Sequence, residues 1–153
     1  MDFKLQVTEL KDLRNAEADA LLVVVGEGSS PDALGKALGS ALSSALKEGD
    51  LAYKAGRCLY LHGLTGVKAS RVVFAATGGA SAKAFRAALV AGLGLLKAGG
   101  ARHLLVASAL PEPIDAAQAE LLAGAVGDAL YVYRHTKPSA PAVSKLQRIT
   151  LAC

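Results

Sequence analysis

The chain has 153 residues, the length of one ordinary domain, and a domain of that size can bury a core without a disulfide or a metal. Its net charge of +4 is modest and its Lys and Arg residues are scattered, which argues against strong nucleic-acid binding and leaves only weak contact open. No apolar run approaches the roughly 18–20 residues that span a bilayer, and we do not expect the charged amino terminus to be a signal peptide. We therefore expect a cytoplasmic protein that does not enter a membrane.

The first half of the chain predicts two strands and a helix. FKLQV at 3–7 alternates apolar and polar residues, as in a half-buried edge strand. ADALLVVVG at 18–26 is a continuous apolar run, typical of a strand covered on both faces. Asp32 is predicted to cap a helix over 33–48, and Gly49 to end it in the left-handed conformation. Leucines repeat every four residues along that helix: Leu34, Leu38, Leu42 and Leu46.

The middle of the chain predicts a hairpin followed by a second helix. RCLYLHG at 57–63 and RVVFAAT at 71–77 are strand-like, and the short connection between them favours antiparallel pairing. Ser81 is predicted to cap a helix that runs to about Ala98. One face of this helix is apolar at helical spacing: Phe85, Ala88, Leu89, Gly92, Leu93 and Leu96. The opposite face is largely apolar too, through Val90, Ala91 and Leu95, so we expect the helix to be covered on more than its sheet side.

The last third adds two strands and a third helix. RHLLVASAL at 102–110 predicts a buried strand, and Asp115 with Gln118 forms a capping-box pattern. The segment 136–144 reads as a polar loop, and KLQRITLAC at 145–153 as a final strand. Apolar residues at helical spacing mark the third helix: Leu121, Leu122, Ala125, Val126, Ala129, Leu130 and Tyr133. Strands that alternate with long helices indicate an α/β fold of three layers, with helices on both faces of a mixed, mostly parallel sheet.

A double glycine stands out as a candidate ligand site. RVVFAATGGASAKAF at 71–85 runs from a strand through Gly78 and Gly79 into a helix, whose N-terminus could bind an anion. The turn matches neither the P-loop nor the dinucleotide-binding pattern, and Lys83 lies inside the helix at the wrong spacing. A structural turn into a close-packed helix is the preferred interpretation. GEGSSP at 26–31 is interpreted as a loop, because Pro31 stands where the dinucleotide pattern has its third glycine.

The ionisable side chains form no catalytic group. Three histidines have no His, Cys or carboxylate at i+3 or i+4 and are expected to be structural or solvent-facing: His62, His103 and His135. Four carboxylates lie at predicted helix ends, where capping and solvation explain them: Glu48, Asp50, Glu112 and Asp115. Cys58 and Cys153 are far apart, have no neighbouring base and are expected to be free thiols. We predict no catalytic, cofactor-binding or metal-ligating residue in this chain.

The order of the elements carries a family resemblance. The run ADALLVVVGEG, the helix LGKALGSALSSAL and the segment GDLAYKAGRCLYLHG follow one another as in the start of the leucine (cytosol) aminopeptidases. RVVFAATGG with the helix AFRAALVAGLGLLKAGGARHLLV, and the closing HTKPSAPAVSKLQRITLAC, resemble that family as well. The resemblance covers essentially the whole chain and rests on order and spacing more than on any invariant motif.

This resemblance implies a macro-domain-like fold and a supporting role. Residues 1–153 would be a single amino-terminal domain, and a larger carboxyl-terminal domain would hold two divalent metals, manganese or zinc. That second domain would cleave residues such as leucine from peptide amino termini. Its motifs, including N-T-D-A-E-G-R, do not occur here, so we expect this chain alone to be inactive and without a cofactor. The implied partners are the catalytic domain of the same polypeptide and five further subunits of a homo-hexamer.

Two alternatives remain open at this stage. Macro domains that bind ADP-ribose use an Asn-rich loop after an early strand and a Gly-rich diphosphate loop. Here the early strand ends in GEGSSPD, which has no Asn, and TGGAS could imitate the second loop only in part. A stand-alone ADP-ribose or nucleotide-binding module is therefore the runner-up, and a DNA-binding accessory domain is the weakest alternative because the charge is scattered.

Overall fold

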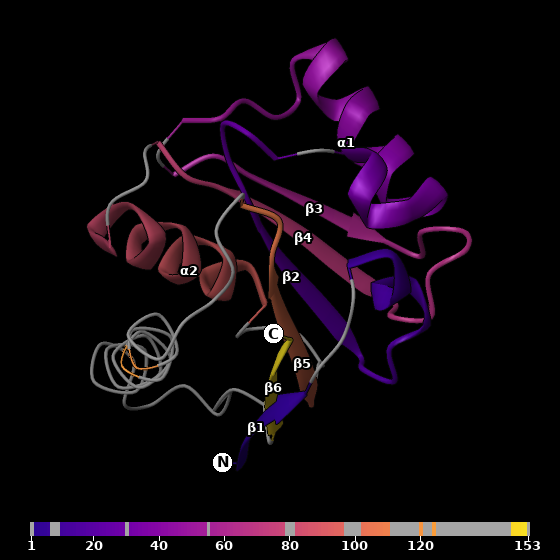
Figure 1. The fold of residues 1–153 in the computed structure, drawn as a ribbon, viewed down its shortest axis with the longest axis vertical. Coiled ribbons are helices and arrows are strands. Elements are labelled where there is room, and N and C mark those ends of the chain that lie inside the picture. Colours follow the sequence, from indigo (N-terminus) through magenta and orange to yellow (C-terminus); the bar gives the residue numbers. More distant parts are fainter. Residues whose placement is uncertain are drawn as a thin grey trace, which may run out of the picture.

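A computed structural model describes residues 2–6, 10–29, 31–54, 56–78, 82–96, 102–110, 120, 124 and 148–152. Six strands form one sheet in the order β1-β6-β5-β2-β4-β3 (Figure 1). Their bounds are β1 Asp2–Gln6, β2 Ala20–Val25, β3 Cys58–His62, β4 Arg71–Ala76, β5 His103–Ser108 and β6 Arg148–Ala152. Every strand predicted from the sequence is present, and each end lies within three residues of its expected position.

The sheet is mixed and mostly parallel, as predicted. Strand β2 pairs in parallel with both β4 and β5, and the parallel pairing continues from β5 to β6 and from β6 to β1. Strand β3 pairs antiparallel with β4, so the predicted hairpin is confirmed. All six side chains of β2 are buried, which its continuous apolar run predicted for a central strand covered on both faces.

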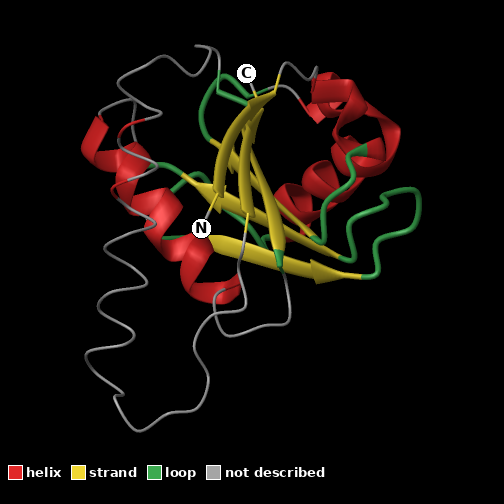
Figure 2. Ribbon diagram, turned by 90° about the horizontal axis from the view of Figure 1, so that it is seen from below, coloured by secondary structure: helices red, strands yellow, loops and turns green. Residues whose placement is uncertain are grey.

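Two helices cover opposite faces of the sheet (Figure 2). Helix α1 spans Gly35–Glu48 and packs over the core that contains Leu21, Val23 and Phe74. Helix α2 spans Ala82–Leu96 and packs over the core that contains Leu22 and Val24. Alternate residues of β2 thus enter the two cores, and the predicted three-layer α/β fold is confirmed. None of the helices among the described residues is long and apolar enough to cross a bilayer.

The start of α1 differs from the prediction. Asp32 lies inside a short 3-10 helix, η2, which spans Pro31–Leu34, and α1 begins only at Gly35. Leu34 occupies the N-cap position without a side-chain hydrogen bond, so the prediction of an Asp32 cap is wrong. The reason is that η2 packs against another 3-10 helix, η1 at Leu10–Asn15, and this tertiary contact extends the turn before the α-helix. The end of α1 is as predicted, with Gly49 at φ +83°.

The outer face of α2 also departs from the prediction. The six predicted apolar residues of its sheet face are buried. Val90 and Leu95 on the opposite side are 39% and 45% exposed, so the expectation of a second covered face is wrong at these two positions. The apolar pattern indicated a buried helix but not the number of layers around it.

Several predictions fall on residues outside the described part of the chain. They are the Ser81 cap, the end of the second helix beyond Leu96, the capping box at Asp115, and the loop at 136–144. Within the predicted third helix only Glu120 and Gly124 are described, and both are helical.

Candidate functional site

The carboxyl ends of β2, β4 and β5 meet at one edge of the sheet, and this edge is the candidate ligand site. Strand β2 lies between the other two. The chain leaves β2 through α1 on one face and leaves β4 through α2 on the other, so the strand order reverses here. Ligands of open α/β sheets bind at such a switch point. Both glycine-containing loops singled out from the sequence begin at this edge, after Val25 and after Ala76.

The first of these loops is closed by its own hydrogen bonds. The backbone N–H of Gly26 donates to Oγ of Ser29 at 3.0 Å. The backbone N–H of Ser29 donates in turn to the carbonyl oxygen of Gly26, also at 3.0 Å. Gly28 has a φ of +87°, the left-handed conformation that glycine adopts without strain. Because these two N–H groups are bonded within the turn, they are not directed at an anion.

Close packing occupies the space between the first and second loops. A Cβ atom added to Gly26 would lie 2.4 Å from Oγ1 of Thr77 and 3.0 Å from Cδ2 of Leu110. Thr77 is 4% exposed, and its backbone N–H donates to the carbonyl oxygen of Val25 at 2.8 Å. Gly26 is therefore required for the approach of β2, β4 and the end of β5, and this packing explains the glycine without a ligand.

The end of β5 is bonded internally as well. The backbone N–H of Ala109 donates to the carbonyl oxygen of Val24 at 2.8 Å, and that of Leu110 donates to Oγ of Ser108 at 3.2 Å. A diphosphate cradle needs backbone N–H groups that point outward. Five N–H groups at this edge are used within the fold, which supports the structural interpretation of the first glycine turn: those of Gly26, Ser29, Thr77, Ala109 and Leu110. Gly79 to Ser81 lie outside the described residues.

The opposite edge of the sheet depends on Asp19, which sequence reasoning did not single out. Oδ2 of Asp19 accepts the backbone N–H groups of Arg102 at 3.0 Å and His103 at 3.1 Å. Its backbone N–H donates to the carbonyl oxygen of His103, and its own carbonyl oxygen accepts from the backbone N–H of Arg71. Asp19 thus joins the amino ends of β2, β4 and β5. An acidic residue directly before a buried strand was the available signal, but the partner strands depend on the sheet order.

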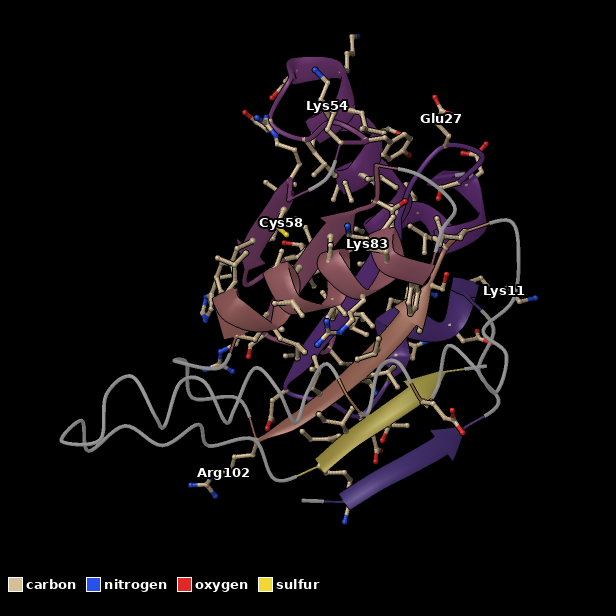
Figure 3. The ribbon with its side chains drawn as sticks, turned by 90° about the vertical axis from the view of Figure 1, so that its left-hand side faces the viewer. Lys11, Glu27, Lys54, Cys58, Lys83 and Arg102 are labelled. Atoms are coloured by element: carbon tan, nitrogen blue, oxygen red, sulfur yellow. The ribbon has the colours of Figure 1, made fainter. Side chains whose placement is uncertain are left out.

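The pKa values of Asp19 and Cys58 are shifted for clear physical reasons. The pKa of Asp19 is lowered chiefly by the hydrogen bond that its carboxylate accepts from the backbone N–H of Arg102. The hydrogen bond from the backbone N–H of His103 and the charges of Arg71 and His103 lower it further, whereas burial opposes the shift. Burial raises the pKa of the half-buried Cys58 thiol on β3, which lies among side chains in Figure 3 and is a free cysteine. The raised pKa of Cys58 is typical of an unreactive thiol.

The histidines do not gather into a site within the described residues. His62 is exposed at the end of β3. Nε2 of His103 lies 2.8 Å from Oγ1 of the buried Thr150, so this ring joins β5 to β6. His135 lies outside the described residues. Across the described part of the chain, no group of three or more His, Cys, Asp or Glu residues could hold a metal ion.

Comparison with known proteins decides the family. Residues 7–139 match the family model of the amino-terminal domain of the cytosol aminopeptidase family. The chain belongs to the cytosol aminopeptidase family. It is 50% identical over 151 residues to a probable cytosol aminopeptidase of Methylibium petroleiphilum, and 38% identical over 156 residues to one of Polaromonas naphthalenivorans. Both matches cover 99% of this chain but only 31% and 29% of the relative, so the chain spans about a third of these relatives.

Solved structures agree on the fold. A tomato leucine aminopeptidase superposes with a TM-score of 0.73 at 18% identity, over all of this chain and 32% of that protein. A Trypanosoma brucei macrodomain in complex with ADP superposes with a TM-score of 0.62 at 15% identity, over 99% of this chain and 63% of the macrodomain. At these identities the likeness shows the fold alone, and it confirms the predicted macro-domain-like architecture. The family match and the curated relatives confirm the resemblance that the sequence indicated.

Proposed function

We propose that residues 1–153 form the amino-terminal structural and assembly domain of a longer cytoplasmic leucyl aminopeptidase. The family match over residues 7–139, with relatives about three times as long, is the observation that carries this proposal. In it, a carboxyl-terminal domain of the same polypeptide releases amino-terminal residues such as leucine from peptides. Two divalent metals, manganese or zinc, would supply the Lewis acid and the activated water in that second domain.

The residues of this chain support a role without chemistry. The described part of the chain offers no ligand cluster that fits a metal ion, and so no reaction step is assigned to it. The edge where α/β folds bind ligands is held together by Gly26, Ser29, Thr77 and Ser108 through internal contacts. A domain packed in this way would brace a neighbouring catalytic domain or restrict access to it.

The size of the natural polypeptide tests this proposal. An antibody raised against the chain would be used on extracts of the source cells. Because this chain of 15.5 kDa corresponds to 31% of a relative's length, the proposal predicts a band at about 50 kDa. A band at the mass of this chain alone would contradict it, and so would a reading frame that stops after the codon for Cys153.

We also propose that the full-length protein assembles as a homo-hexamer with catalytic domains at its centre and amino-terminal domains outside. The isolated chain should then be a monomer or a weak dimer in sedimentation velocity. A stable hexamer of the isolated chain would contradict this arrangement, because it would place the main assembly contacts in the amino-terminal domain.

ADP-ribose binding is the second candidate function, and the likeness to a macrodomain solved with ADP favours it. The internal hydrogen bonds of the carboxyl edge oppose it. Calorimetric titration of the chain with ADP-ribose separates the two functions, and we expect no heat above that of dilution. A Kd in the low micromolar range, about −8 kcal/mol, would instead assign ligand binding to this edge.

A further inference from the structure

A cationic depression lies beside α1, and none of the residues that line it belongs to the glycine loops or to the Asp19 junction described above. It has a volume of about 490 Å³ and lies between α1, the end of η1 and the connection from β3 to β4. Figure 1 shows these three segments together on the right-hand side of the molecule. The residues that line it are Arg14, Lys36, Ala37, Ser40, Ala41, Ser44, Leu64, Thr65 and Gly66.

The walls of this depression are fixed by specific contacts. The backbone N–H of Lys68 donates to the carbonyl oxygen of Arg14 at 2.8 Å, which ties the β3–β4 connection to η1. A Cβ atom added to Gly66 would lie 3.1 Å from Cβ of Ala37, so the same connection touches α1 directly. Gly66 has a φ of +87°, a conformation that suits glycine. The depression is therefore a preformed feature of the fold.

Its lining combines an apolar base with a polar and cationic rim. The apolar side chains Ala37, Ala41 and Leu64 are half-buried, whereas Lys36, Ser40 and Ser44 repeat every four residues and are exposed. Arg14 is exposed at the end of η1. No Asp or Glu is among the described lining residues, and within the described chain neither Arg14 nor Lys36 is paired with a carboxylate.

We propose that this depression is a docking site for an acidic peptide segment of a partner protein, in which carboxylates flank an apolar side chain. Arg14 and Lys36 would bind the carboxylates, Arg14 through two parallel hydrogen bonds. The seryl and threonyl hydroxyls would donate to the same groups, and the apolar residue would contact the base formed by Ala37, Ala41 and Leu64.

The lining favours a peptide over a nucleic acid. Nucleic-acid affinity comes from several coordinated phosphate contacts, and two cations supply only a fraction of them. Binding of single strands also uses aromatic side chains for base stacking, and the described lining contains no Phe, Tyr or Trp. An apolar base beside two cations matches instead the mixed apolar and acidic surface of a peptide.

Fluorescence anisotropy of labelled peptides tests the proposal. The probes are acidic peptides in which two glutamates flank a leucine at one-, two- and three-residue spacings, and the same peptides with glutamine in place of glutamate. The 153-residue chain is compared with an Arg14→Glu/Lys36→Glu variant. A matched control, Lys54→Glu/Lys83→Glu, has the same net charge but changes exposed lysines that do not line the depression; Figure 3 shows Lys83 on α2.

The proposal predicts that at least one acidic peptide binds and its glutamine counterpart does not. The Arg14→Glu/Lys36→Glu variant should lose at least about tenfold in affinity, and the control should stay within about twofold of the unchanged chain. Circular dichroism confirms that each variant is folded. The proposal is overturned if no acidic peptide binds, if both variants lose affinity equally, or if a duplex or single-stranded oligonucleotide binds the site more tightly than every peptide.

Discussion

Gly92 lies where α2 packs tightly against the sheet. A Cβ atom at this position would lie 2.4 Å from Cδ1 of Leu22 and 3.3 Å from Cβ of Ala75. Leu22 is fully buried in the centre of the sheet, so its methyl group cannot move without displacing other core side chains. Gly94, two residues further along the same helix, is exposed, and an added Cβ there would meet nothing within 4 Å. The two glycines therefore form a matched pair.

The perturbation is a single methyl group at each of these positions. Alanine is favoured over glycine in a helix by about 1 kcal/mol, so Gly94→Ala should stabilise the protein by up to that amount. Gly92→Ala has the same gain, but overpacking of a well-filled core costs about 1–3 kcal/mol. A contact as short as 2.4 Å places the cost near the upper limit. We expect Gly92→Ala to lower the free energy of unfolding by about 2 kcal/mol.

Urea unfolding followed by circular dichroism measures both variants, since the chain has no Trp to report by fluorescence. The two variants should differ by about 3 kcal/mol, and their melting temperatures should differ in the same sense. The reasoning would be refuted if Gly92→Ala stabilised the protein as much as Gly94→Ala, because α2 would then not contact β2 as closely as the structure shows.

Three further substitutions test other contacts. Asp19→Asn should lower the free energy of unfolding by about 1 kcal/mol at pH 7. The pKa of Asp19 is lower in the folded chain than in the unfolded chain. The stability that the ionised carboxylate contributes is therefore present above the unfolded pKa and is lost as the pH falls through the folded pKa. The difference from the unchanged chain should thus shrink in acid, and a pH-independent difference would refute it. Gly26→Ala should be destabilising, and Thr77→Ala should relieve part of the loss in a double-mutant cycle; additivity would contradict the contact. In a Cys153→Ser variant, the rate at which iodoacetamide alkylates Cys58 should be measured as a function of pH. The midpoint of that pH profile should lie above the pKa of an ordinary thiol, because burial raises the pKa of Cys58. A midpoint at the ordinary pKa would count against that burial.

Periodicity predicted the regular elements well because their burial depends on local spacing. The continuous apolar run of β2 and the four-residue leucine repeat of α1 each indicate a type of element without reference to any partner. The hairpin of β3 and β4 followed from its short connection. Asp32 failed as a cap because η1, which is distant in the sequence, packs against η2 and delays the start of the helix.

Only part of the candidate site was predictable from the sequence. The glycine turns were interpreted as structural because they lack the phosphate-binding patterns, and the packing around Gly26 supports this interpretation for the first turn. The contacts that make them structural could not be predicted, because Gly26, Thr77 and Leu110 meet only through the non-sequential strand order. For the same reason the sequence did not reveal Asp19 as the junction of three strands. The exposure of Val90 and Leu95 was missed because an apolar helix face does not specify what covers it.

Hydrolysis of leucine para-nitroanilide is the measurement that tests most directly whether this domain supports chemistry performed elsewhere. The purified chain and the full-length protein would each be assayed with added manganese or zinc. We predict turnover by the full-length protein and none by the chain alone. Turnover by the chain that rises in proportion to its concentration and survives repurification would contradict the account.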